Sequence, residues 1–268
     1  MTILEQITNY KMQEVSERKE LVPVKLLEKS IYYNSPTVSL KDYINRADKS
    51  GIIAEFKRRS PSKGFINEYA NPEKVSIGYM QAGASALSVL TDEKFFGGSN
   101  KDLSIVRKFN YCPILRKDFI IDEYQIIEAK SIGADAILLI AAILSPAQLI
   151  EYDKFAHSLG LEVLFEVHDN EDLRKIELGN KIIGVNNRNL KTFETNIQTS
   201  IALSEMIPSD CLKVSESGID SVESIIELKK FGFKGFLIGE TFMKTSNPEN
   251  TCKEFILKMR KVSRNKIN

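Results

Sequence analysis

The residues best suited to chemistry in this chain are charged side chains that directly follow short apolar runs. Glu55 and Lys57 close the run that begins at Ile52, and they lie two residues apart. Because side chains alternate along a strand, both would point to the same side. Burying a carboxylate and an ammonium group is costly unless they are paired or used. The spacing therefore indicates either a structural ion pair or the first wall of an active site.

Four later apolar runs end in charged or polar side chains in the same way. These are Lys117 in LRKDF, Glu166 in FEVHD, Asn186 and Arg188 in VNNR, and Glu216 and Ser217 in VSESG. Each has a structural alternative: Lys117 could lie on the surface, Glu166 could cap the next helix, and Arg188 could neutralise Glu216. As a set they are poorly explained by stability, because buried ion pairs often add little. Mixed charge of this kind is typical of acid–base chemistry on an anionic substrate.

Two glycine turns near the end of the chain predict a phosphate site. Gly218 lies in ESGID and Gly239 in IGETF, where backbone N–H groups can approach an anion without a Cβ in the way. Ser60, in the segment after the first apolar run, could add a hydroxyl group. The alternative is that these glycines serve turn geometry alone.

Two further motifs stay open between a chemical and a structural interpretation. His168 would share a face with Glu166 and could act as a general base. We favour a structural role, because His168 begins the segment HDNEDL, in which Asp169 is a good helix cap. The run from Phe95 to Gly98 is either an apolar flap over an aromatic substrate or a packed loop.

The elements that must position these residues follow a repeated pattern of helix, breaker and apolar run. Five helical stretches end at glycine, which adopts the left-handed conformation past a helix end without a Cβ penalty; these are Gly83, Gly133, Gly160, Gly179 and Gly232. Pro113 and Pro208 mark two further junctions. Eight strands are predicted, near Ile52, Leu87, Ile114, Ile137, Val163, Ile182, Leu212 and Phe236.

The eight predicted strands favour a (β/α)8 TIM barrel. Each is a continuous apolar run, which is typical of a parallel sheet covered by helices, such as those predicted at 122–132, 146–159 and 221–231. An open doubly wound sheet would usually carry GxGxxG after its first strand, and that motif is absent from the sequence. Active sites of such barrels lie at the C-terminal ends of the strands, where the charged side chains fall.

The first fifty residues precede the first predicted strand and carry no chemical motif. Amphipathic spacing predicts helices over 2–18 and 39–47, the latter with Ser39 as its N-cap, and a second helix after Pro23 within the stretch 21–33. We expect residues 1–50 to form a helical extension packed as a lid or floor on a barrel of residues 51–268, the two making one structural domain.

Composition excludes several classes of function. The chain has 268 residues and a formal net charge of +1, so no global field favours nucleic acid or a membrane. Three cysteines and two histidines lie at no metal-ligand spacing. We find no signal peptide and no apolar run long enough to span a membrane, and therefore expect a cytoplasmic protein without a metal.

The motifs together resemble one family. IIAEFKRRSPSKG, SVLTDEKFFGGS, PILRKDFI, LLIAAIL, VLFEVHD, IIGVNNRNLKTF, KVSESGI and FLIGETFM resemble indole-3-glycerol-phosphate synthase in order and spacing. The resemblance runs from about Ile3 to Phe255, because ILEQITNYKMQEVSERK also looks like the N-terminal helix of that family. Arg59 departs from it, standing where many members carry a smaller residue.

The resemblance implies an activity. The enzyme would close the indole ring of 1-(2-carboxyphenylamino)-1-deoxyribulose 5-phosphate with loss of CO2 and water, in tryptophan biosynthesis. It would need no cofactor, and its partner would be this phosphorylated small molecule, with no nucleic acid and no membrane. The chain would be a monomer or a weak homodimer.

The resemblance also implies roles for individual residues. Lys117 would be the general acid, Glu166 would serve the dehydration, and Lys57 would shuttle a proton. The residues implied to position the substrate and the lysines are Glu55, Asn186 and Glu216, and Arg188 would lie with Lys57 near the substrate carboxylate. Ser217 is included as a substrate contact, and the phosphate site would comprise Ser60, Gly218, Gly239 and Glu240. The pocket around the aromatic ring would comprise Phe96, Phe119, Leu138, Leu190 and Leu237.

Two alternatives of different classes remain at this point. One is another sugar-phosphate barrel enzyme, either an isomerase or a Schiff-base aldolase using Lys117. The other is a barrel that binds phosphorylated metabolites without catalysis.

Overall fold

A computed structural model describes residues 2–190 and 192–265 of the chain. Eight parallel strands form a closed barrel in which the first strand pairs with both the second and the last. The barrel strands are β1 (Ile52–Phe56), β4 (Ala86–Leu90), β5 (Ile114–Lys117), β6 (Ala136–Ile140), β7 (Glu162–Val167), β8 (Ile182–Asn186), β9 (Leu212–Glu216) and β10 (Phe233–Ile238). This confirms the predicted (β/α)8 barrel and its eight strands.

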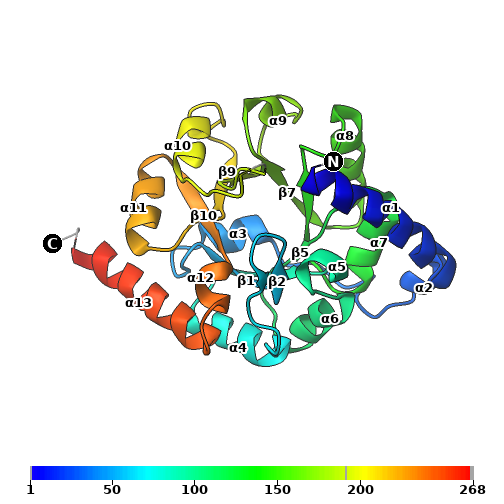
Figure 1. Cartoon of the computed structure of the whole chain (residues 1–268), viewed down its shortest axis with the longest axis horizontal. Coiled ribbons are helices and arrows are strands. Elements are labelled where there is room, and N and C mark those ends of the chain that lie inside the picture. Colours follow the sequence, from blue (N-terminus) through cyan, green and yellow to red (C-terminus); the bar gives the residue numbers. More distant parts are fainter. Residues whose placement is uncertain (1, 191, 266–268) are drawn as a thin grey trace.

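Helices surround the strands (Figure 1). They are α4 (Pro72–Ala82), α5 (Glu93–Phe96), α6 (Asn100–Phe109), α7 (Glu123–Ser131), α8 (Pro146–Ser158), α9 (Asn170–Arg174), α10 (Gln198–Ser204), α11 (Val222–Lys230), α12 (Glu240–Met243) and α13 (Pro248–Asn265). The five glycines predicted at helix ends all have positive φ, from 77° at Gly160 to 125° at Gly179. At Gly83, which follows α4, φ is 100°, a conformation that a side chain with a Cβ rarely adopts.

Alternation along the strands separates an inner core from an outer core. Leu115, Leu164 and Val214 belong to the inner cluster, whereas Ile114 and Phe165 belong to the cluster that faces the helices. Because the period along a strand is two residues, the inner positions continue to the residues that leave the barrel at its C-terminal end. The last inward-facing side chain of each strand therefore lies at the C-terminal end of the barrel, its mouth.

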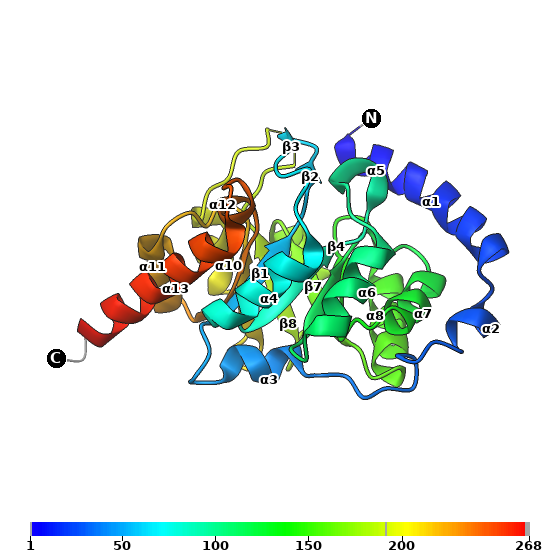
Figure 2. The same cartoon turned by 90° about the horizontal axis from the view of Figure 1, so that it is seen from below.

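The N-terminal segment contacts the barrel at both ends. Helix α1 (Ile3–Leu21) lies with α5 and the hairpin of β2 (Arg59–Ser60) and β3 (Gly64–Phe65) at one end, whereas α3 (Leu40–Asn45) lies at the other (Figure 2). Leu40 and Ile44 of α3 are buried in the inner core, so α3 forms a floor. Ser39 caps α3 as predicted, by accepting a hydrogen bond from the backbone N–H of Asp42.

The helix predicted within 21–33 is wrong over most of its length. Helix α1 runs on to Leu21, and only α2 (Val24–Leu27) is helical in the predicted range. Pro23 separates the two helices because it lacks the N–H group that a helix interior requires. Beyond α2, Ser30 Oγ accepts a hydrogen bond from Tyr32 N, a local bond that competes with helix, and it donates to the distant carbonyl of Ser131. Ile31 is 79% exposed, so a helix there would have had no apolar face to bury.

Among residues 2–190 and 192–265, no helix has both the length and the apolar character needed to cross a membrane.

Candidate active site

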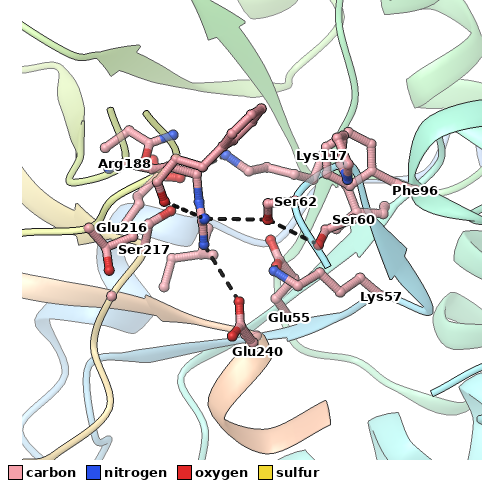
Figure 3. Close-up of a pocket in the computed structure, with 18 of the residues that line it drawn as sticks. Glu55, Lys57, Ser60, Ser62, Phe96, Lys117, Arg188, Glu216, Ser217 and Glu240 are labelled. Carbon is pink, nitrogen blue, oxygen red and sulfur yellow. Dashed lines mark hydrogen bonds and ion pairs between the residues drawn. The ribbon is translucent and has the colours of Figure 1, made fainter. Parts of the chain in front are cut away.

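A cavity of about 420 Å³ opens at the C-terminal mouth of the barrel. This volume suits a small organic ligand. Every site residue predicted from the sequence lines it; these are Glu55, Lys57, Ser60, Phe96, Lys117, Phe119, Leu138, Glu166, Asn186, Arg188, Leu190, Glu216, Ser217, Gly218, Leu237, Gly239 and Glu240. Figure 3 shows residues of this pocket converging from different strands and loops, ten of them labelled.

The strand period explains why these side chains meet. Lys117, Glu166 and Glu216 each lie two residues beyond an inward-facing apolar residue of β5, β7 or β9. Glu55 stands in the same relation to Ile53 on β1. The charged groups are thus the last inward positions of buried strands, as the sequence predicted.

Lys117 lies between two carboxylates. Its Nζ is 2.5 Å from Glu166 Oε2 and 2.7 Å from Glu216 Oε2, and Asn186 Nδ2 donates to the other oxygen of Glu166 at 3.1 Å. These contacts overturn two structural alternatives, that Lys117 is a surface residue and that Glu166 caps a helix. The cap of α9 is Asp169, as predicted.

Burial and charge act in opposite directions on the pKa values of this cluster. Burial by itself lowers the pKa of Lys117, but Glu166 and Glu216 outweigh it and hold the pKa above its usual value. Burial raises the pKa of Glu216 to about 7, with the Glu166 charge adding to the effect and Lys117 opposing it. For Glu166, burial is outweighed by Lys117 and His168, and the pKa is lowered to about 2. The pKa values of two carboxylates that share one lysine separate in this way, and the two groups titrate as a coupled pair.

Glu55 and Lys57 form an ion pair and also line the pocket. Lys57 Nζ lies 2.7 Å from Glu55 Oε1, and both side chains are largely buried. The structural and the functional interpretations of the opening motif are therefore compatible.

Arg188 connects three loops at the rim of the pocket. Its guanidinium lies 3.5 Å from Glu240 Oε2, 3.3 Å from Ser62 Oγ and 3.0 Å from the Phe193 carbonyl (Figure 3). Ser62 Oγ is in turn 3.4 Å from Ser60 Oγ. The alternative that Arg188 neutralises Glu216 is wrong.

The glycine turns lie beside these loops. Ser217 and Gly218 both have positive φ, 67° and 70°, so the backbone curls at the end of β9. At Gly239 a Cβ atom would lie 2.3 Å from Glu55 Oε1, so a side chain there would displace the Glu55 carboxylate whatever binds nearby.

Aromatic side chains form the opposite wall. The rings of Phe96 and Phe119 lie 5.8 Å apart, whereas Phe95 packs edge-on against Tyr10 of α1. The run 95–98 therefore combines both interpretations: Phe96 lines the pocket, as expected of an apolar flap over the substrate, whereas Phe95 packs against α1 as part of a packed loop.

Sequence reasoning missed the contribution of α1. Ile3, Leu4 and Ile7 line the cavity, and Ile7 is only 2% exposed. Their helical spacing was visible, but nothing in one sequence indicates that this apolar stripe faces a pocket. His168 is not among the lining residues: its ring nitrogens lie 3.4 Å from Glu166 Oε1 and 3.3 Å from Asp172 Oδ2, which agrees with the structural interpretation.

No cluster of three His, Cys, Asp or Glu side chains suited to a metal ion occurs in the described part of the chain.

Comparisons with known proteins agree on one family. The model of the family described as indole-3-glycerol phosphate synthase matches residues 4–255. A protein of that name from Bacteroides thetaiotaomicron is 50% identical over 254 residues, covering 95% of this chain and 97% of its own length. Another, from Caldanaerobacter subterraneus subsp. tengcongensis, is 45% identical over 260 residues, covering 96% and 99%. A solved structure described as "Native KDPGal structure" is similar in fold alone, with a TM-score of 0.55, 14% identity, and coverage of 81% of this chain and 95% of that one.

Proposed function

The chain belongs to the indole-3-glycerol phosphate synthase family, and we propose that its catalysis centres on Lys117 in the pocket at the barrel mouth. The enzyme is a carboxy-lyase of tryptophan biosynthesis. It closes the indole ring of 1-(2-carboxyphenylamino)-1-deoxyribulose 5-phosphate with loss of CO2 and water.

The observation that carries the proposal is the placement of Lys117 between Glu166 and Glu216. A lysine that forms a Schiff base must lose its proton, which calls for a lowered pKa. The raised pKa keeps Lys117 an ammonium group, which disfavours a Schiff base and leaves a proton in place, and we assign Lys117 as the proton donor. In this role it protonates the substrate ketone oxygen as the ring carbon attacks.

Glu166 is suited to the later proton transfers. Its lowered pKa keeps it ionised, and the amide of Asn186 fixes one of its oxygens. We assign it the proton removed in the dehydration step, after CO2 has left. Glu216 holds Lys117 from the other side and orients its Nζ.

The two ends of the pocket suit the two ends of the substrate. Phe96, Phe119 and Leu138 offer an apolar wall for the anthranilate ring, and Leu190 and Leu237 complete it. Lys57 and Arg188 are the cations for the ring carboxylate, with Ser217 as a further contact. For the phosphate we assign Ser60, Gly218, Gly239 and Glu240, mainly through backbone N–H groups.

Replacement of Lys117 by alanine tests the assignment. General acid catalysis typically contributes about 10²–10⁴-fold, so Lys117→Ala should lower kcat by that factor with substrate still bound. The chain contains no tryptophan, so indole fluorescence reports the product without a protein indole background. Lys234→Ala is the matched control, since Lys234 is an exposed lysine on β10 whose Nζ contacts Asn45. Full turnover by Lys117→Ala would refute the role.

We further propose that residues 1–50 and 51–268 act as one structural domain, and that the enzyme works in the cytoplasm as a monomer or weak homodimer without nucleic acid. The continuous inner core shared by α1, α3 and the strands supports the first point. Sedimentation velocity across a range of concentrations tests the oligomeric state.

A further inference from the structure

Six charged side chains form a closed loop of alternating ion pairs between α1 and the barrel. The members of this ion-pair ring are Lys11, Glu14 and Arg18 of α1, Arg116 and Asp118 at the end of β5, and Glu128 of α7. Around the ring, the closest N–O distances are 2.9 Å for Lys11–Glu14, 3.0 Å for Glu14–Arg18, 2.9 Å for Arg18–Glu128, 2.6 Å for Glu128–Arg116, 3.1 Å for Arg116–Asp118 and 3.0 Å for Asp118–Lys11.

The ring is buried where it meets the barrel. The side chains of Lys11 and Arg116 are each 1% exposed, and that of Asp118 is 2% exposed. Burial lowers the pKa of Lys11, but the charges of Asp118 and Asp92 outweigh it and the pKa is raised. A buried ionic network adds little net stability, and its best-attested use is to fix one geometry.

The ion-pair ring includes the two residues on either side of Lys117 in the sequence, Arg116 and Asp118. Side chains alternate along β5, so Arg116 points outward to the ring where Lys117 points into the pocket. Asp118 follows β5 at the edge of the pocket, and its carboxylate pairs with Arg116 and Lys11. Asp118 also accepts hydrogen bonds from Thr91 Oγ1 at 2.6 Å and from the backbone N–H of Phe119 at 2.8 Å. The backbone that carries Lys117 is therefore held on its outer side.

Lys11 extends this hold to the neighbouring loop. Its Nζ lies 2.9 Å from Asp92 Oδ2, and Asp92 is fully buried. The other oxygen of Asp92 accepts from the backbone N–H groups of Phe95 and Phe96, and so caps α5. Phe96 in turn lies against Phe119 in the wall of the pocket.

We propose that Lys11 is a positioning residue for the reaction, because its single ammonium group ties the loops that follow β4 and β5 and thereby sets both Lys117 and Phe96. Lys11 is not among the residues that line the pocket and acts through Asp118 and Asp92. The inference rests on the proposed role of Lys117.

Lys11→Met tests the proposal with Lys19→Met as the matched control. Lys19 lies on the same helix, is 47% exposed and pairs with Asp122. A misplacement of 1 Å can cost about 10²-fold in rate, so Lys11→Met should lower kcat/KM by about ten- to a hundredfold, measured well below its melting temperature. Lys19→Met should match the parent enzyme. Unchanged kcat/KM in Lys11→Met would overturn the proposal.

The double variant Lys11→Met/Asp92→Asn separates positioning from charge balance. Asparagine keeps the α5 cap, since it is as good an N-cap as aspartate, and removes the carboxylate that Lys11→Met leaves without a cation. The double variant should regain thermal stability relative to Lys11→Met while kcat/KM stays low. Recovery of kcat/KM in parallel with the melting temperature would overturn the proposal, because it would reduce Lys11 to a counter-ion.

Asp92→Asn alone provides a variant in which Lys11 keeps Glu14 and Asp118 as partners. It should raise KM more than it lowers kcat, because it loosens the Phe96 side and leaves the Lys117 side held. An unchanged KM would again overturn the proposal, including where Lys11→Met fails to fold. Failure of the parent enzyme to release indole product would refute the proposed function instead, so the two failures are distinguishable.

Discussion

Replacing Glu216 by glutamine tests the electrostatics of the Lys117 cluster through the pH dependence of stability. Glu216 is 1% exposed, its Oε2 contacts Lys117, and its pKa is raised to about 7 by burial and by the charge of Glu166. Glutamine keeps the shape and an oxygen acceptor for the ammonium group but cannot titrate. The variant therefore removes one proton equilibrium and leaves the Glu166–Lys117 pair in place.

The sign and size follow from linkage between proton binding and folding. Between the ordinary glutamate pKa of 4.5 and about 7, the folded protein holds a proton on Glu216 that the unfolded chain releases. The free energy of unfolding therefore falls as pH rises through this window. At 1.36 kcal/mol per pKa unit, the loss is about 3 kcal/mol. Glu166 acts in the opposite direction, since its lowered pKa gives stability that is lost only as pH falls from 4.5 towards 2.

Urea unfolding at a series of pH values from 5 to 8, followed by circular dichroism, measures this difference. The parent enzyme should lose stability across the window, and Glu216→Gln should lose less by about 3 kcal/mol. Glu227→Gln is the control, because Glu227 is a partly exposed carboxylate of α11 that pairs with Lys230. Parallel curves for the parent enzyme and Glu216→Gln would refute the reasoning, since they would mean that Glu216 is ionised throughout.

Two further substitutions test the glycine turns. Gly239→Ala should lower kcat as well as raise KM, because its Cβ would lie 2.3 Å from Glu55 Oε1 and displace that carboxylate; a rise in KM alone would contradict this. Asn187→Ala should destabilise the fold by about 2 kcal/mol, because the buried amide donates to the carbonyl of Ser217 and its loss leaves buried groups unpaired. An unchanged urea midpoint for Asn187→Ala would show that the left-handed Ser217 is held by other contacts.

The barrel and its mouth could be predicted because both follow from local rules. Continuous apolar runs between helix-ending glycines indicate parallel strands, and parallel strands in a closed barrel all end at the same rim. The period of two then places Glu55, Lys117, Glu166 and Glu216 inside that rim without knowledge of any contact. The predicted helix within 21–33 fails for a non-local reason, because Ser30 donates a hydrogen bond to the carbonyl of Ser131, which is distant in sequence.

The part that could not be predicted depends on which elements meet. Nothing in the sequence singles out Lys11, Asp92 or Asp118 as partners. Their pairing joins positions about a hundred residues apart, and no spacing within α1 reveals it. The same holds for Ile3 and Leu4, whose apolar character fits a core contact as well as a substrate pocket.

The alternation along β5 explains why the proposed catalytic lysine and a residue of the ion-pair ring lie side by side on one strand of four residues. Lys117 faces the pocket only while Arg116 faces outward, and a shift of one residue in register would exchange them. That shift would bury Arg116 against Glu166 and Glu216 inside the barrel and expose Lys117 to α7. The ion-pair ring opposes this shift, because it would separate Arg116 from Glu128 and Asp118 from Lys11, which are pairs of opposite charge. We therefore expect α1, although it carries none of the predicted catalytic residues, to help determine which side chains of β5 point into the pocket.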